Sequence, residues 1–165
     1  MRKGIIISRA SPTDAADIQV FWNPIIRESF VTFTHVQKST DDIASMIETQ
    51  PFFVAKHSTQ RGAKVVGFAT YGPFRGGDGY AHTVEHTVIL APDARGKSIG
   101  TCLMNALESD ARDNDIHSMI AGVAADNSAA LAFHTALGYI KVAHIPEVGR
   151  KFDRWLDLVL LQKIL

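Results

Sequence analysis

The chain has 165 residues, of which 46% are hydrophobic and 21% are charged, a composition typical of one globular domain with a buried core. Lysine and arginine together number 17, as do aspartate and glutamate, so no net charge favours nucleic acid or an anionic membrane as a partner. Cys102 is the single cysteine, so we expect no internal disulfide. The apolar run in MRKGIII is too short for a signal peptide, and no stretch approaches the roughly 18 apolar residues of a membrane span. We therefore expect a cytoplasmic protein.

The first half of the sequence predicts strands and helices from β-branched runs, helix-capping residues and prolines. The first strand is expected at 5–7, and a helix that starts at 11–14 turns Ile18 and Phe21 inward and is interrupted by Asn23-Pro24. A second helix has Thr40 as its N-cap, carries Ile43, Met46 and Ile47 on one face and ends at Pro51. Neighbouring antiparallel strands follow at 52–56 and 65–71, and then a glycine-rich loop at 72–79.

The second half predicts a strand at 84–90, a turn at Pro92-Asp93, a helix with the apolar stripe Ile99, Cys102, Leu103, Ala106, Leu107 and Ala111, a strand at 119–123, a helix capped by Asp126 or Asn127 and stopped by Gly138, and strands at 140–144 and 155–162. The resulting order, βααβββαβαββ, contains no internal repeat. It predicts a single α+β (mixed α/β) domain over residues 1–165, with helices packed over one mixed sheet.

The segment APDARGKS, residues 91–98, matches a loosened phosphate loop if alanine is accepted at the first glycine position. Pro92 and Arg95 restrict the backbone where a nucleotide triphosphate loop needs freedom, and several strands precede the segment. No apolar strand ending in aspartate follows it to hold magnesium. We therefore disfavour a nucleotide triphosphatase.

The segment HTVEH, residues 82–86, spells a zinc-protease pattern, which works only on a helix that places both imidazoles on one face. The β-branched residues around it predict a strand, on which His82 and His86 would lie roughly 13 Å apart. One zinc ion cannot bridge that distance. We expect no metal, and both histidines are expected to be partly buried with hydrogen-bond partners.

The strand at 84–90, the turn and the helix that follows can also form one anion-binding unit. Free backbone N–H groups from Gly96 to Thr101 would point at a diphosphate, aided by the helix dipole and by Arg95 and Lys97. An ordinary strand-to-helix turn with two solvated basic residues explains the same pattern, and the residues alone leave both interpretations open.

Together with Asn127, this segment resembles the GNAT superfamily of acyltransferases, whose acetyl-CoA motif reads Gln/Arg-x-x-Gly-x-Gly/Ala and is represented here by Arg95, Ser98 and Gly100. Within that superfamily, the chain resembles the phosphinothricin and methionine sulfone/sulfoximine N-acetyltransferases over nearly its whole length, from about Ile5 to Leu165. Five ordered blocks carry this resemblance: NPIIRESFVTF at 23–33, GFATYGPFR at 67–75, TVEHTV at 83–88, NSAALAFHTALGY at 127–139 and VGRKFDRWLD at 148–157.

The resemblance implies acetyl-CoA as co-substrate and a small amine, an amino acid or an analogue, as acceptor. It implies that acetyl-CoA is bound by Val88, Ile89, Leu90, Arg95, Gly96, Lys97, Ser98, Ile99, Gly100, Thr101 and Asn127. It implies that the acceptor is bound by Arg75, Gly76, Gly77, Glu85, His86 and Thr87, with the arginine pairing with a carboxylate. One strand N–H would polarise the thioester carbonyl.

Glu85 is an anionic residue inside an apolar strand, where a carboxylate is costly unless it is paired or functional. The resemblance implies that Glu85 is the base that deprotonates the acceptor ammonium. A structural ion pair with Arg75 or Arg154 is the alternative. His134 stands where many relatives have a tyrosine that protonates the leaving thiolate, a role histidine can fill; the alternative is a surface residue on a helix.

The expected function is therefore direct acetyl transfer to the α-amine of a small amino acid or analogue. Acetylation of a peptide N-terminus or an aminoglycoside, and a CoA-binding sensor without catalysis, remain alternatives, because fold does not fix function. The resemblance also implies a homodimer.

Overall fold

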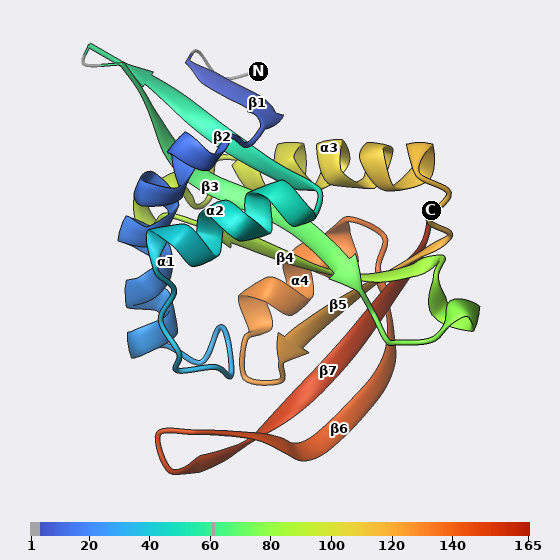
Figure 1. The fold of residues 1–165 in the computed structure, drawn as a ribbon. Helices are drawn as coiled ribbons and strands as arrows, with labels where there is room; N and C mark the ends of the chain where they lie inside the picture. Colours follow the sequence, from blue (N-terminus) through green and yellow to red (C-terminus); the bar gives the residue numbers. More distant parts are fainter. Residues whose placement is uncertain (1–3, 61) are drawn as a thin grey trace.

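A computed structural model describes residues 4–60 and 62–165 and contains, within them, the seven strands and four α-helices expected from the sequence, in the expected order (Figure 1). The strands are β1 (Ile5–Arg9), β2 (Phe52–Thr59), β3 (Gly62–Pro73), β4 (Thr83–Leu90), β5 (Ser118–Ala124), β6 (Ile140–Lys151) and β7 (Arg154–Ile164). The helices are α1 (Ala15–Glu28), α2 (Thr40–Thr49), α3 (Ile99–Asp113) and α4 (Ser128–Ala136).

The strands form one sheet in the order β1-β2-β3-β4-β5-β7-β6. Among the described residues, β4 and β5 make the only parallel pair, and every other neighbouring pair is antiparallel. The mixed sheet expected from the sequence is confirmed and is mostly antiparallel, and the expected antiparallel pairing of β2 with β3 is also confirmed.

The pairing of β4 with β5 is short. It runs from Thr83 opposite Ser118 to His86 opposite Ala121 and then stops, while β4 stays paired with β3 as far as Leu90. The two central strands therefore diverge from residue 87 onward, which leaves one side of β4 without a neighbouring strand in the described part of the chain.

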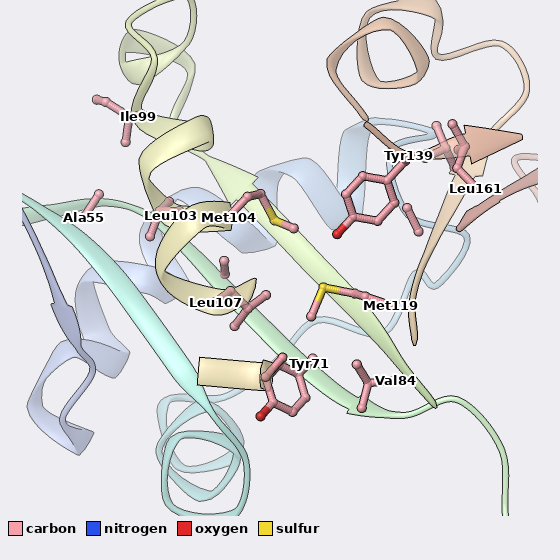
Figure 2. Packing of buried hydrophobic residues seen from close by; sticks show 14 of the residues in the cluster. Ala55, Tyr71, Val84, Ile99, Leu103, Met104, Leu107, Met119, Tyr139 and Leu161 are labelled. Carbon is pink, nitrogen blue, oxygen red and sulfur yellow. The ribbon is translucent and has the colours of Figure 1, made fainter. Parts of the chain in front are cut away.

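Helices cover both faces of the sheet. The first core cluster joins α1 and α2 to one face through residues such as Ile18, Ile26 and Phe68. The second lies on the opposite face under α3 and α4, and Figure 2 shows Leu103, Met104 and Leu107 of α3 directed at the strands. Burial of these apolar faces holds the layers together. No helix within the described residues is both long and apolar enough to cross a membrane.

Several boundaries differ from the sequence-based expectations. Pro24 does not interrupt α1, which continues to Glu28, because Ile25 and Ile26 are buried and their packing outweighs one lost backbone hydrogen bond. The N-cap of α2 is Ser39 rather than Thr40, since its side chain accepts from Asp42 N–H in a capping box. Cys102 is exposed, outside the buried stripe of α3.

The last two strands form a longer hairpin than the strands predicted at 140–144 and 155–162. β6 reaches Lys151 and β7 begins at Arg154, with register shifts that accommodate the irregular middle of β6. The two residues between them, Phe152 and Asp153, both have positive φ values, 50° and 56°. This is the geometry of a two-residue hairpin turn, although neither residue is the glycine or asparagine that usually marks one.

Candidate functional site

A cleft opens where β4 and β5 diverge. One part is a cavity of about 370 Å³ lined by Glu85 and His86, and the second is a cavity of about 320 Å³ that reaches Arg95, Gly96 and Gly100. Both parts share a set of lining residues, namely Val31, Val88, Ile89, Asn127, Ala130 and His134. The carboxylate of Glu85 and the start of α3 therefore belong to one continuous cleft.

The backbone of β4 supplies hydrogen-bonding groups to this cleft. Thr83 O accepts from Phe74 N–H at one end of the strand, and Ala91 N–H donates to Val66 O just beyond the other end, so odd-numbered residues direct their backbone groups at β3. Because these groups alternate along a strand, the N–H and C=O of Val88 and Leu90 point away from β3. They face the gap that β5 leaves.

Glu85 lies on the α1/α2 side of the sheet, against the backbone of β5. A Cβ atom at Gly122 would stand 2.7 Å from Glu85 Oε1, so glycine at this position is what lets the carboxylate lie there. Burial raises the pKa of Glu85 above its ordinary value of 4.5.

The ion pairs considered for Glu85 are not formed. Among the described residues, no basic side chain lies within 4.0 Å of its carboxylate; Arg154 pairs with Asp126 instead, at 3.4 Å, and the Arg75 guanidinium stands 5.7 Å from the ring of Phe74. The Glu85 side chain is solvent-accessible at the cleft, and a carboxylate there without a cationic partner is available to a ligand.

His86 and His134 form a buried pair on the opposite side of β4. Their Nε2 atoms are 3.0 Å apart, and Nδ1 of His134 lies 2.7 Å from Ala130 O. A carbonyl only accepts, so Nδ1 of His134 carries a proton. In the neutral ring its Nε2 is then an acceptor, and the proton between the rings belongs to Nε2 of His86.

Burial is the main reason why the pKa of each histidine is lowered. The pKa of His86 falls to about 3, with the neighbouring His134 as a second cause, and the pKa of His134 is also below its ordinary value. Both rings are therefore neutral near neutral pH. Nδ1 of His86 is buried with no hydrogen-bond partner in the part of the chain that is described. His86 is thus fully rather than partly buried. His82 is exposed rather than partly buried, although its Nδ1 lies 2.7 Å from Asp115 O.

The turn before α3 has the geometry of an anion site at a helix N-terminus. Ser98 is the N-cap of α3 and has a φ of 59°, the left-handed conformation that glycine adopts more readily. Gly96 also has a positive φ, and nothing within 4 Å would meet a Cβ atom there, so the backbone is open to a ligand. The first N–H groups of α3 lack helical acceptors.

The other residues of this turn have separate surroundings. Arg95 and Gly100 line the cleft, but a Cβ atom at Gly100 would come within 3.2 Å of the Phe133 ring, so this glycine also permits close packing of α3 on α4. Lys97 donates to Asp93 O at 2.6 Å and, with Ile99, lines a different cavity of about 370 Å³. Ser98 and Thr101 line neither of these cavities.

Asn127 combines two roles at the start of α4. Its Oδ1 accepts from Ala130 N–H at 3.1 Å, which confirms it as the N-cap, and the residue lines both parts of the cleft.

The predicted acceptor residues divide into two groups. Glu85, His86 and Thr87 line the cleft, whereas Arg75, Gly76 and Gly77 line a separate cavity of about 470 Å³ at the end of β3. In the segment 82–86, the residues from Thr83 onward belong to strand β4, as expected, which excludes the helical zinc-protease geometry. In residues 4–60 and 62–165, no three His, Cys, Asp or Glu side chains are grouped closely enough to hold a metal ion.

One wall of the cleft consists of residues for which no site role was expected. This wall consists of Trp22 from α1 and of Val31, Thr32 and Phe33 from the loop after it. The loop residues lie in the NPIIRESFVTF block, which marked a resemblance but no contact. Gly122 was also missed, although a glycine inside a strand is a recognised sign of close approach.

Comparisons with known proteins identify the family of the chain. A model of the acetyltransferase (GNAT) family matches residues 22–139. The chain is 46% identical over 98 residues to the L-amino acid N-acyltransferase MnaT of Escherichia coli, an alignment that covers 59% of this chain and 57% of that protein. It is 33% identical over 155 residues to the L-methionine sulfoximine/L-methionine sulfone acetyltransferase of Salmonella typhimurium, covering 93% of this chain and 90% of the relative.

A solved structure shows the same fold. It is a GNAT superfamily phosphinothricin acetyltransferase from Sinorhizobium meliloti in complex with acetyl-CoA, with a TM-score of 0.89 and 28% identity, and the match covers 98% of this chain and 89% of that one.

Proposed function

Because the chain belongs to the acetyltransferase (GNAT) family, we propose that it transfers the acetyl group of acetyl-CoA to the α-amine of a small amino acid or amino-acid analogue. The observation that carries this proposal is the unpaired carboxylate of Glu85, which lies in one continuous cleft with the N-terminus of α3. The relatives that act on methionine sulfone, methionine sulfoximine and phosphinothricin point to the same class of acceptor.

The residues at the start of α3 fit a CoA diphosphate. The open backbone at Gly96, the unpaired first N–H groups of α3 and the cationic Arg95 all offer attraction to an anion. The pantetheine arm would lie along β4, where Val88 and Leu90 present free backbone groups. The Val88 N–H is the group that we expect to donate to the thioester oxygen as negative charge develops there.

Glu85 acts as the base. An acceptor ammonium has no lone pair, so Glu85 must take one proton from it before the nitrogen can attack the thioester carbonyl. Attack gives a tetrahedral adduct whose nitrogen still carries an extra proton. The adduct loses this second proton and its C–S bond breaks, which gives the amide and a thiolate. The thiolate takes up one proton, so each turnover releases one net proton to solvent. The pKa of Glu85, raised by burial, brings the carboxylate closer to the proton affinity that a base needs near neutral pH.

His134 is proposed to protonate the thiolate, with a condition that follows from its tautomer. The neutral pair has no proton available on Nε2 of His134, so His134 and His86 must first take up one proton together. The pKa values of both rings are lowered, so the pair binds this proton less readily as pH increases. Activity that depends on the proton should therefore be greatest at acidic pH and decline toward neutral pH.

The acceptor side of the cleft favours an uncharged side chain. Its lining, within the described residues, includes Trp22, Val31 and Phe33 but no lysine or arginine. We propose that Arg75 and the backbone of Gly76 and Gly77 bind the acceptor carboxylate, which requires this loop to move toward Glu85 from its present cavity. A second anionic group, as in phosphinothricin, would then lack a partner.

The experiment that tests the proposed function mixes the protein with acetyl-CoA and a panel of amino acids, methionine sulfone, methionine sulfoximine, phosphinothricin, a peptide and an aminoglycoside, and measures thiol release. We expect the fastest release with an acceptor whose side chain is uncharged. Release only with the peptide or aminoglycoside would contradict the acceptor class, and CoA binding without any release would indicate a sensor. Glu85→Gln should keep CoA binding and lose most turnover; unchanged turnover would remove Glu85 from the base role.

We also propose a cytoplasmic homodimer. β6 is an edge strand of the sheet and exposes Ile140 and Val142, which are 71% and 52% accessible and are suited to burial against a second copy. The exposed thiol of Cys102 suits a reducing compartment. Light scattering of the purified protein tests the oligomeric state.

A further inference from the structure

Lys151 is a buried cation that the proposed chemistry does not use. It is only 1% accessible at the end of β6, and its Nζ donates to three backbone oxygens, those of Ile26, Ser29 and Thr32, each at 2.7 Å. These bonds use all three ammonium protons. Within the described residues, no carboxylate lies within 4.0 Å of Nζ.

The three acceptors belong to the end of α1 and the loop that follows it. The last carbonyls of a helix lack intrahelical partners, and the negative end of the helix dipole favours a cation there. Lys151 fills this role from a strand more than a hundred residues later in the sequence. Burial lowers its pKa, so the site depends on the carbonyls to keep the ammonium charged.

Further contacts join the same two segments, which we call the acceptor loop (29–33) and the hairpin turn (149–154). A Cβ atom at Gly149 would come within 2.2 Å of the Phe33 ring, so that ring lies directly on the strand backbone. Phe30 meets Phe152 edge to face at 5.1 Å, and the Arg154 guanidinium stands 5.0 Å from the Phe30 ring. In Figure 1 the loop after α1 lies on the side of the β6–β7 hairpin tip.

The hairpin turn itself is held in an uncommon conformation. Phe152 and Asp153 both occupy the left-handed region, which costs free energy for residues other than glycine. The packing of Phe152 on Phe30 stabilises this arrangement, and the turn in turn sets where Lys151 and Gly149 meet the loop.

We propose that Lys151 is a positioning residue that fixes the acceptor-facing wall of the cleft. Val31, Thr32 and Phe33 of the acceptor loop line the same part of the cleft as Glu85, whereas Lys151 does not line it. Lys151 therefore acts through the loop. Removing its three hydrogen bonds frees the wall against which the acceptor packs. Thr32 and Phe33 line only the part of the cleft at Glu85, and Val31 also lines the part at Arg95 and Gly100. The acceptor side should therefore be affected more than the CoA side.

The test is Lys151→Met, which keeps an unbranched apolar stem but has no donor, in parallel with Lys163→Met. Lys163 is the matched control because it is a partly buried lysine of β7 that pairs with Glu108 of α3, remote from the acceptor loop. For Lys151→Met we expect the KM for the acceptor to rise about tenfold or more and the Kd for CoA to stay within about twofold. The proposal would be overturned if Lys151→Met and Lys163→Met changed the acceptor KM equally and also changed the Kd for CoA equally.

The kinetic readout rests on the proposed function, so a readout without turnover accompanies it. Hydrogen exchange should show faster exchange at residues 29–33 in Lys151→Met and unchanged exchange there in Lys163→Met. Unchanged exchange in a folded Lys151→Met protein would overturn the proposal even if no acceptor is ever found. A wild-type protein that acetylates nothing, with loosened exchange in the variant, would contradict the proposed function alone.

Gly149→Ala provides a second route if Lys151→Met does not fold. The added methyl group displaces the Phe33 ring while Lys151 stays in place, so the acceptor KM should rise. Combining it with Phe33→Leu, which removes the clashing ring atoms, should recover part of the loss. An acceptor KM that stays unchanged in Gly149→Ala would show that the loop position does not matter for the acceptor.

Discussion

Substituting Gly122 with alanine tests whether the position of the Glu85 carboxylate matters for turnover. The new Cβ would stand 2.7 Å from Oε1, and ordinary contacts begin at 3.4 Å, so the carboxylate must move by about 0.7 Å. The atom that moves is the end of a flexible side chain, so the fold should survive. Displacement of a catalytic group on this scale reduces turnover by about 10- to 100-fold.

The assay is steady-state kinetics of thiol release, with thermal unfolding measured on the same samples. We expect kcat to fall, the Kd for CoA to change little, and stability to remain within about 1 kcal/mol of the wild type, because alanine in a strand loses less backbone entropy than glycine. The double variant with Glu85→Gln should be no slower than Glu85→Gln alone. A folded Gly122→Ala protein with unchanged kcat would contradict the prediction that turnover depends on where this contact places the Glu85 carboxylate.

Three further predictions concern other parts of the site. The pKa of His86 is about 3 in the folded protein against 6.5 in an unfolded chain, so the unfolded state binds more protons between these pH values and stability falls as pH falls. Between about pH 7 and about pH 5, His86 should lower the free energy of unfolding, measured with urea, by about 2 kcal/mol. His86→Phe should remove this part of the pH dependence. Ser98→Gly should raise stability by about 0.5 kcal/mol, measured by thermal unfolding, because it relieves a left-handed serine; a lower melting temperature would contradict this. Asn127→Ser should keep the cap of α4 and its stability while weakening CoA binding, and calorimetric titration with unchanged affinity would limit Asn127 to the cap.

Local patterns predicted most of the fold. The strand at β4 and the apolar stripe of α3 follow from side-chain periodicity, and the order of the elements follows from the breaks between them. The exceptions depend on contacts that are remote in sequence. Pro24 stays inside α1 because buried isoleucines hold the next turn, and β6 extends past Pro146 because β7 pairs with it. No local signal reports either contact.

The candidate site divides in the same way. Glu85 stands out in the sequence as a charge in an apolar strand, and the structure places it in the cleft with the start of α3. Its proposed role as a base stays a prediction. The wall formed by Trp22 and Phe33 could not be found, because ordinary aromatic residues become a wall only when the loop after α1 meets the β6–β7 hairpin.

The early separation of β4 from β5 has a consequence for the lifetime of the protein. The backbone groups of Val88 and Leu90 face no neighbouring strand on the β5 side of β4, near the centre of the sheet. A ligand that forms hydrogen bonds with these backbone groups binds the folded state. At a concentration a hundredfold above its Kd, it stabilises that state by about 2.7 kcal/mol. The empty protein should unfold and be degraded first, so the amount of this protein in a cell should follow the supply of the molecule that fills the cleft.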